Sequence, residues 1–374
     1  MTWLIVQNDA RQLPLRDQSV QCVVTSPPYW GLRDYGVTGQ IGLEQTPEEY
    51  VARMVEVFRE VRRVLRDDGT CWVNLGDSYA SAVKGSGGPS DKQLSNAGSF
   101  HNVSQRLSHG LKDKDLVGIP WRIAFALQAD GWYLRSDIIW SKPNPMPESV
   151  TDRPTKAHEY VFLLAKRERY FFDQDAVKEQ SSGLIGGRFG SYPDSTMRRD
   201  AERDRPEDNG TRNIRTVWEI ATQPYPESHF ATFPEELAIR CIKAGSSEKG
   251  CCAECGAPRE RVTKRGELVP DAPGYTARGT IRGNDGFVKN AMTPAGATQG
   301  HPNFHYESKT LGWQPTCKHD APTKPCIVLD PFGGAGTVAL VADKLNRTGI
   351  ALELKREYCQ MARKRCYDDS PLFA

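Results

Sequence analysis

The chain has 374 residues, of which 38% are hydrophobic and 26% are charged, and its formal net charge is +2. This length exceeds that of one typical domain, so we expect one large core with insertions, or two lobes. The longest apolar runs are only as long as strands, so we expect no membrane span, and the N-terminus lacks the features of a secretory signal. The small net charge neither supports nor excludes nucleic acid, because it averages out any local basic face.

Short apolar runs alternate with helical patterns along the chain, which favours an α/β fold with a mainly parallel sheet. Strands are expected at residues 3–7, 21–26, 70–76, 137–142, 159–166, 326–330 and 348–354. Helices are expected at residues 46–65, 118–130, 234–244, 337–346 and 355–367. Thr46 and Glu49 form a capping-box pattern at the start of the first helix.

Three stretches interrupt this alternation and are expected to be insertions. Residues 79–115 are rich in Ser, Gly, Lys and Asn, residues 174–216 mix Arg with acidic residues, and residues 251–325 begin with cysteines and contain many Gly, Pro and Thr. Loops of this length are commonly functional or disordered, and an ordinary solvated insertion is an equally good interpretation of each.

The hexapeptide TSPPYW, at residues 25–30, follows an expected apolar strand directly. Two consecutive prolines cannot continue a central strand, so the chain leaves the sheet there in a stiff, extended form. Ligands bind at the carboxyl ends of parallel strands, and this segment offers a hydroxyl, carbonyls and two aromatic rings at such an end. The oxygens can accept hydrogen bonds from an amine, and Tyr29 can stack on a planar base. A simple strand end followed by a turn is the alternative, which the full hexapeptide disfavours.

A glycine-rich segment, DPFGGAGT at residues 330–337, lies between an expected strand and an expected helix. Glycines at such a turn let the backbone approach a ligand closely. No lysine follows the last glycine, which excludes a P-loop, and the spacing is not that of the dinucleotide fingerprint. Glu353 ends the next expected strand, where a carboxylate can accept hydrogen bonds from both ribose hydroxyls of an adenosine. These features favour a nucleoside ligand without a pyrophosphate.

Together with HFATFPEEL at residues 229–237, the two segments resemble those of the amino-methylating DNA methyltransferases, which make N4-methylcytosine or N6-methyladenine. The catalytic motif precedes the cofactor motif by about three hundred residues, as in the β-group of that family. The resemblance implies a DNA methyltransferase that uses S-adenosylmethionine on a Rossmann-like α/β fold with circularly permuted motif order. The catalytic residues that it implies are Ser26, Pro27, Pro28 and Tyr29. The cofactor-binding residues that it implies are Asp330, Phe332, Gly334, Gly336, Thr337, Glu353, Phe233, Pro234, Glu236 and Asp9.

The resemblance also implies a mostly parallel, seven-stranded sheet of strand order 3-2-1-4-5-7-6, in which the chain begins at strand 3 and ends with strands 1 and 2. The two strands that carry the motifs then lie side by side. Residues 1–173 are expected to form the catalytic half of one domain, and residues 217–250 and 326–374 its cofactor-binding half. Residues 174–216 are expected to recognise the target, and residues 251–325 to be an insertion held by zinc.

The expected reaction is methyl transfer to an exocyclic amine, a weak nucleophile because its lone pair is delocalised into the ring. Hydrogen bonds from its N–H groups to Ser26 and to the Pro27 carbonyl would favour a pyramidal nitrogen, and no covalent intermediate is needed. The base must first be flipped out of the duplex. In this family serine at the first motif position is typical of N4-cytosine enzymes and aspartate of N6-adenine enzymes. We therefore expect cytosine, with adenine as the alternative.

Two close pairs of metal-ligand type lie about sixty residues apart: Cys252 with Cys255, and Cys317 with His319. Four sulfur and nitrogen ligands in this arrangement fit a structural Zn²⁺ site at the base of an insertion. Cys251 could replace Cys252, and Cys326 could replace His319; free thiols are the alternative interpretation. The other cysteines have apolar or helical contexts and are expected to be buried thiols: Cys22, Cys71, Cys241, Cys359 and Cys366.

The insertion at residues 174–216 carries arginines that could contact phosphates or guanine edges: Arg188, Arg198, Arg199, Arg212 and Arg215. Acidic residues are interleaved with them, so a solvated loop is an almost equally good interpretation. Lys142, Arg153 and Lys156 flank strand ends and could also reach DNA.

Two other classes of protein share some of these features. An NAD-dependent Rossmann enzyme would have a glycine-rich turn and an acid after the second strand, but it leaves TSPPYW unexplained. A non-catalytic nucleic-acid-binding protein on the same fold is the other, and RNA or protein is an alternative methyl acceptor. The expected partners are double-stranded DNA and a cognate restriction endonuclease, in the cytoplasm of a prokaryotic cell or of a phage-infected host.

Overall fold

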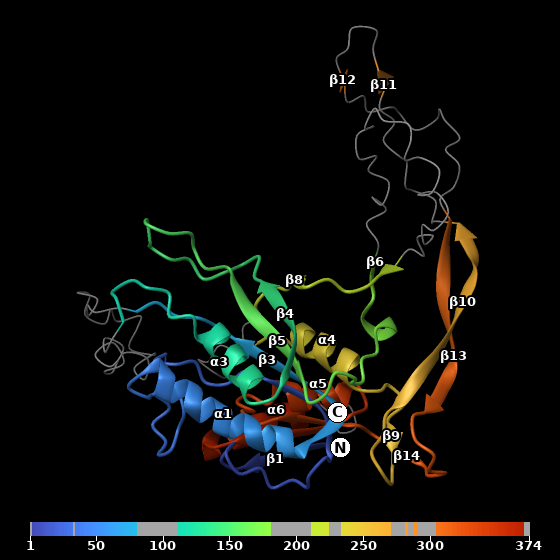
Figure 1. The fold of residues 1–374 in the computed structure, drawn as a ribbon, viewed down its shortest axis with the longest axis horizontal. Coiled ribbons are helices and arrows are strands. Elements are labelled where there is room, and N and C mark those ends of the chain that lie inside the picture. The colour runs from blue at the N-terminus through green and yellow to red at the C-terminus, as the bar shows by residue number, and fades with distance from the viewer. Residues whose placement is uncertain are drawn as a thin grey trace. The chain divides into compact units, whose positions relative to one another are not determined.

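The computed structural model describes residues 2–32, 34–80, 111–180, 211–223, 233–270, 281–282, 288–289 and 304–369. The chain divides into two compact units, and Figure 1 labels most of their helices and strands. The first unit consists of Met1–Val177, Arg215–Glu260 and Trp313–Ala374 and holds both sequence motifs. The second unit consists of Lys178–Ile214 and Arg261–Gly312. None of the described helices is long and apolar enough to cross a membrane.

An eight-stranded sheet forms the centre of the first unit. In spatial order its strands are β1 (Trp3–Gln7), β16 (Thr348–Glu353), β15 (Ile327–Asp330), β2 (Val20–Thr25), β3 (Leu65–Leu75), β5 (His158–Ala165), β4 (Tyr133–Ser141) and β8 (Val217–Glu219). Neighbours pair in parallel except at β5, which is antiparallel to β3 and to β4. The first seven strands follow the permuted order predicted from the sequence. The predicted Rossmann-like methyltransferase fold is therefore confirmed.

The prediction of seven strands is wrong by one. β8 pairs in parallel with the end of β4, with Val217 opposite Ile139. β8 has only three residues, which is too short for an apolar run that would predict a strand from the sequence. The indole of Trp218 is buried, with its ring centre 6.3 Å from that of Trp72. Contact with a distant strand therefore stabilises β8, and such contacts have no local sequence signal.

All five expected helices are present. They are α1 (Pro47–Val64), α3 (Ile119–Ala129), α4 (Glu235–Gly245), α5 (Thr337–Lys344) and α6 (Arg356–Asp368). A short 3₁₀ helix, η2, covers Asp175–Val177. The predicted cap of α1 is confirmed, because the Thr46 hydroxyl accepts from the Glu49 N–H at 3.2 Å. The Glu49 carboxylate accepts in turn from the N–H of Gln45, one residue before the cap, at 3.1 Å.

The helices cover both faces of the sheet (Figure 1). Consecutive residues of β1 show this, since Val6 packs against the apolar cluster of α1 and α3, and Ile5 against that of α5 and α6. α1 buries Tyr50, Met54, Val57, Phe58 and Val61, which recur at the helical spacing. On the other face α4 packs closely on β2 and β3, where a Cβ at Gly245 would lie 2.3 Å from the Thr70 hydroxyl. The sheet is therefore enclosed on both sides, and ligands can reach it only at its ends.

A carboxylate at the end of β3 fixes the start of α3. The Asp77 Oδ1 atom accepts from the backbone N–H groups of Gly118 and Ile119, each at 3.0 Å. Gly118 has φ +76°, a conformation that favours glycine. This remote cap satisfies N–H groups that a helix start otherwise leaves without partners.

The remaining described strands form four separate pairs, of which three are short and antiparallel. β6 (Glu179–Gln180) pairs with β7 (Thr211–Arg212), and β11 (Ile281–Arg282) with β12 (Val288–Lys289). β9 (Cys251–Cys252) pairs with β14 (Thr323–Lys324). β10 (Arg259–Pro270) pairs with β13 (Phe304–Pro315). The insertion at residues 251–325 thus starts and ends in the β9–β14 pair. The five cysteines expected to be buried thiols are all buried.

Candidate active site and metal cluster

The two sequence motifs meet at the centre of the sheet. β2 and β15 pair in parallel, with Cys22 opposite Val328 and Val23 opposite Leu329. Both strands end at the same edge, where the Thr25 hydroxyl donates to Asp330 Oδ1 at 2.7 Å. Both of these side chains are buried. The predicted juxtaposition of the two motif strands is therefore confirmed.

The proline segment after β2 is held in place by contacts with α1 and with the chain that precedes α1. The Tyr50 hydroxyl of α1 donates to the Pro28 carbonyl at 2.7 Å. The buried Trp30 indole donates to the Glu44 carbonyl at 3.0 Å. These two hydrogen bonds use the Pro28 carbonyl and the Trp30 indole, and they fix the conformation of the segment before any ligand binds.

Asn74, at the end of β3, presents an oxygen to the serine of the motif. Its Nδ2 donates to the Tyr160 carbonyl at 3.2 Å, which directs its Oδ1 toward Ser26. The Ser26 hydroxyl donates to that oxygen at 3.2 Å. Because a carbonyl oxygen only accepts, the hydroxyl proton points at Asn74 and the lone pairs of Ser26 Oγ point elsewhere. Ser26 is thus set to accept a hydrogen bond.

Tyr29 is fixed from two sides. Its hydroxyl donates to Glu159 Oε2 at 2.6 Å, and the other carboxylate oxygen of Glu159 pairs with the Lys142 ammonium. Burial and this carboxylate raise the pKa of Tyr29 well above its usual value, so the phenol stays neutral and donates. A Cβ at Gly76 would lie 2.5 Å from the Tyr29 ring, so only glycine leaves room for it. The ring is therefore held in one place.

The glycine turn wraps around the end of β16. The Gly333 N–H donates to the Leu352 carbonyl at 2.7 Å, and the Gly334 N–H to Glu353 Oε2 at 3.0 Å. Gly336 has φ +76°, and a Cβ there would lie 2.9 Å from Ala362. At Gly334, by contrast, an added Cβ would have only one atom within 4 Å, the Phe332 backbone oxygen at 3.9 Å. The turn therefore packs tightly against the protein on one side and leaves space next to Glu353 on the other.

Two acids lie in this part of the site. Asp330 Oδ1 accepts from Thr25 and from the Phe332 N–H, the latter at 3.0 Å. Burial raises the pKa of Asp330 to about 7, and the nearby Glu353 carboxylate contributes to this rise. Burial also raises the pKa of Glu353. Such clustered, perturbed acids at the end of a parallel sheet are typical of ligand sites.

Comparison with known proteins identifies the family. The sequence profile of a DNA methylase family, the N6/N4 methylases, matches residues 20–254 and 323–364. The type II methyltransferase M.XycI of Xanthomonas campestris pv. cyanopsidis is 49% identical over 355 residues, which cover 95% of this chain and 83% of that protein. M.SmaI of Serratia marcescens is 38% identical over 365 residues, which cover 96% and 89%. The chain belongs to the N6/N4 DNA methylase family. It is an S-adenosylmethionine-dependent methyltransferase of DNA amino groups.

Solved structures share the fold of this methylase at low sequence identity. The PvuII DNA methyltransferase aligns with a TM-score of 0.52 and 15% identity over 98% of this chain and 91% of that one. A Thermus thermophilus protein, solved in complex with S-adenosyl-L-methionine, aligns with a TM-score of 0.50 and 18% identity over 99% and 95%. These likenesses establish the architecture alone.

The FPEEL segment lies at the start of α4 in the methylase. Pro234 caps this helix and Phe233 precedes it. The predicted Glu236 pairs with Arg240 of its own helix at 2.8 Å. Glu235, which the motif comparison did not single out, instead binds Arg365 of α6 at 3.1 Å. Arg365 also donates to the buried Thr337 hydroxyl at 2.8 Å, so this network links α4, α5 and α6.

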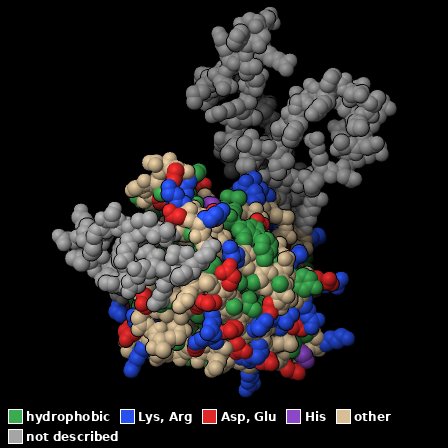
Figure 2. Space-filling model, turned by 60° about the vertical axis from the view of Figure 1, so that its left-hand side comes forward, with side chains coloured by type: hydrophobic (Ala, Val, Ile, Leu, Met, Phe, Trp, Pro, Cys, Tyr) green, Lys and Arg blue, Asp and Glu red, His purple; other side chains and the backbone are tan. Residues whose placement is uncertain are grey.

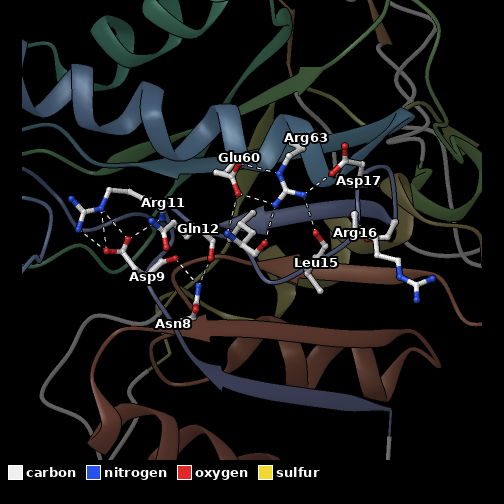
Figure 3. A network of polar contacts seen from close by, with 11 residues as sticks. Asn8, Asp9, Arg11, Gln12, Leu15, Arg16, Asp17, Glu60 and Arg63 are labelled. Atoms are coloured by element: carbon white, nitrogen blue, oxygen red, sulfur yellow. Dashed lines mark hydrogen bonds and ion pairs between the residues drawn. The ribbon is translucent and has the colours of Figure 1, made fainter.

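Asp9 lies at the same sheet edge as Glu353. β1 pairs with β16 up to Gln7 opposite Glu353, and Asp9 follows two residues later. Its carboxylate pairs with Arg11 at 2.5 Å, as Figure 3 shows, and this hydrogen bond lowers its pKa. Asp9 is thus close to the proposed cofactor site and already has a charged partner.

The four predicted zinc ligands form a cluster in the methylase. The sulfur and imidazole atoms of Cys252, Cys255, Cys317 and His319 all lie within 4.8 Å of one another. Backbone N–H groups of Cys255 and Glu254 lower the pKa of Cys252 to about 6, which favours the thiolate. The alternative ligands lie elsewhere, since Cys251 bonds weakly to the Pro325 carbonyl and Cys326 to that of Ser247, both at 3.8 Å.

The predicted DNA-contacting residues have mixed placements. Arg188, Arg198 and Arg199 lie outside the described residues. Arg212 is in β7, 3.8 Å from Glu179, and Arg215 precedes β8. Lys156 is partly buried and donates to the Asp77 carbonyl at 2.6 Å, and burial lowers its pKa. On the face shown in Figure 2, basic and acidic side chains are interspersed, in keeping with the small net charge.

Sequence reasoning missed Asn74 and Glu159, which touch the residues of the catalytic motif. Asn74 had a signal, because it is a polar residue inside the apolar run TCWVNLG. A buried polar side chain needs hydrogen-bond partners and therefore often marks a site. Glu159 had no such signal in the sequence, because an acidic residue at the start of a strand is ordinarily exposed to solvent.

Replacement of Asp330 tests its raised pKa. The folded protein holds the Asp330 proton up to about pH 7, whereas an unfolded aspartate loses it near its ordinary pKa of 3.8. Stability therefore falls as pH rises across this interval. We expect Asp330→Asn, which keeps the accepting oxygen, to stabilise the ligand-free protein by roughly 1–3 kcal/mol at pH 8 and little at pH 4. Urea unfolding at both pH values measures this. The exposed control Asp34→Asn keeps the oxygen that accepts from the Gly36 N–H and should show no such difference. An equal effect of Asp330→Asn at both pH values would contradict the expectation.

Proposed function

We propose that this methylase modifies N4 of cytosine in duplex DNA after flipping the base out of the helix. The observation that carries the proposal is the orientation of Ser26. Its proton is directed to Asn74, so its oxygen is available to accept from the exocyclic amine. The Pro27 carbonyl is proposed to accept from the second N–H, which favours a nitrogen with a localised lone pair. Tyr29 would stack on the base.

The space beside Gly334 supports a site for S-adenosylmethionine. Glu353, at the tip of β16, would accept from the ribose hydroxyls, and the open side of the turn at Gly334 would admit the nucleoside, while Gly336 packs against α6 and sets the shape of the turn. The other residues proposed to line this site are Asp330, Phe332, Thr337, Phe233, Pro234, Glu236 and Asp9. When bound, S-adenosylmethionine supplies an electrophilic methyl group. The residues of the two motifs would hold and orient the amine, so that its nitrogen–carbon bond forms as the methyl–sulfur bond of the donor breaks. The thioether product would then leave, and the nitrogen would give up one proton to solvent.

The preference for cytosine rests on the hydrogen bond between the residue at position 26 and Asn74. Asn74 offers an oxygen to position 26, which suits a hydroxyl and disfavours a carboxylate, because a carboxylate cannot donate to that oxygen. In the family, serine at this position is typical of N4-cytosine enzymes. The PvuII enzyme, named as cytosine-N4-specific, has the same fold, so the architecture is compatible with that reaction.

Base analysis tests the target. DNA from cells that express the protein should contain N4-methylcytosine when digested and examined by nucleoside mass spectrometry. Ser26→Ala should lower kcat by about 100-fold or more, because it removes an acceptor that acts at the reacting nitrogen. Ser19→Ala, near the opposite end of β2, is the matched control and should keep wild-type activity. Detection of N6-methyladenine alone would exclude the cytosine assignment while leaving amino methylation intact.

The stacking role of Tyr29 can be tested through Gly76. Gly76→Ala places a methyl group where the Tyr29 ring lies and should displace it. We expect kcat/KM for DNA to fall about 10- to 100-fold, as for Tyr29→Ala. In the Tyr29→Ala background the extra methyl group meets open space, so Gly76→Ala should then cost little. Full additivity of the two changes would show that Gly76 acts in some other way.

We also propose that the cysteine–histidine cluster holds a structural Zn²⁺ ion. Four ligands close together leave no open position, as in structural rather than catalytic zinc sites. Cys255 precedes β10 and Cys317 follows β13, so the ion would join the two ends of the insertion. Its chemistry would be confined to stabilising this junction.

Metal analysis tests the zinc site with a matched pair of cysteines. Wild-type protein, purified without chelator, should contain about one zinc per chain. Cys252→Ala should lose the metal and several degrees in Tm. Cys251→Ala changes the adjacent thiol outside the cluster and should retain the zinc. Equal zinc contents in the two variants, or a metal-free wild type, would rule out this ligand set.

The relatives M.XycI and M.SmaI are named type II methyltransferases. This supports the proposal that the protein acts in the cytoplasm beside a restriction endonuclease and protects host DNA from it. The insertion at residues 174–216 is proposed to recognise the target sequence, with Arg212 and Arg215 among its DNA contacts.

A further inference from the structure

The segment between β4 and β5, residues 142–157, begins beside the proposed base pocket. β4 runs parallel to β2 and β3, so it ends at the same edge of the sheet as the catalytic motif. The Lys142 N–H donates to the Ala157 carbonyl at 2.8 Å and closes the base of the segment. The Lys142 ammonium pairs with Glu159, which accepts from Tyr29. The segment is therefore linked to the Tyr29 ring, which is proposed to stack on the target base, through two contacts: Lys142 with Glu159, and Glu159 with Tyr29.

The segment is braced on both sides. Asn144 accepts from the Thr222 N–H at 2.9 Å and donates to the Thr222 carbonyl at 3.5 Å. Arg153 pairs with Glu148 at 2.6 Å, and its guanidinium lies 3.9 Å from the centre of the Tyr79 ring. Four prolines restrict the backbone further: Pro143, Pro145, Pro147 and Pro154. These contacts and prolines therefore stiffen the segment before any partner binds.

Met146 lies in this segment, between Pro145 and Pro147. The residue is 85% exposed, the highest value among the exposed large hydrophobic residues of the described chain, where the next reach 60%. A single exposed apolar residue is common on protein surfaces. Here, however, it is presented by a stiff segment that starts at the edge of the pocket.

We infer, on the basis of the proposed function, that Met146 enters the base stack of the DNA when the target is flipped. Flipping costs a few kcal/mol because the target base leaves its pairing partner and the neighbouring bases lose a stacking partner. Methionine is among the apolar side chains that insert between base steps. Met146 is four residues from Lys142, so it lies within about 14 Å of the residue that borders the proposed pocket. Its flexible thioether fills irregular space and so occupies the vacated position.

The test compares two duplexes in methylation assays with the full-length protein. One contains the mapped target site, and the other has an abasic site opposite the target base, so that flipping no longer breaks a base pair. We expect Met146→Ala to lower kcat/KM about 10- to 100-fold on the paired duplex and less than threefold on the abasic one. Met146→Leu should restore most of the activity on the paired duplex, because it keeps the apolar volume.

Val150→Ala, in the same segment, is the matched control and should act like wild type on both duplexes. Wild-type activity of Met146→Ala on the paired duplex would overturn the inference and leave the proposed function intact. An equal loss on both duplexes would also overturn it, because Met146 would then be a general contact. Failure of the wild type to methylate either duplex would remove the proposed function itself, and the inference with it.

Discussion

The active site of this methylase depends on the pairing of β2 with β15, two strands about three hundred residues apart in the chain. Parallel strands end at the same edge, so this one pairing brings the serine segment next to the glycine turn. The buried hydrogen bond from Thr25 to Asp330 then fixes the distance between them. A proton on Asp330 also relieves the cost of burying two neighbouring acids. Loss of this contact would separate the two walls of the site.

A second set of contacts orients the side chains of the catalytic motif before substrate binds. Asn74 directs its oxygen to Ser26 because its amide is tied to a backbone carbonyl of β5. Glu159, also on β5, holds the Tyr29 hydroxyl and is itself neutralised by Lys142. The antiparallel strand β5 therefore determines the orientation of two motif residues that follow another strand. Preorganised groups of this kind need little rearrangement when a substrate binds.

The chain tolerates a long insertion between α4 and β15 because its ends are joined locally. β9 pairs with β14, and the cysteine–histidine cluster lies beside this pair. β15 can then enter the sheet beside β2, whatever the length of the chain that precedes it. The entropic cost of bringing the two ends of a loop together grows only slowly with the length of the loop, so a long insertion costs little more free energy than a short one. The proposed zinc site would contribute to that junction.

The sequence by itself determined the five helices, because apolar periodicity is a local property. Its resemblance to a known family determined the order of the first seven strands and the meeting of the two motifs. It also singled out the four clustered metal ligands. Only the tertiary structure decided the eighth strand, the partners Asn74 and Glu159, and the role of Glu235 rather than Glu236 in linking α4 to α6. Each of these depends on which distant side chain lies opposite, and that follows from packing across the sheet rather than from neighbouring residues.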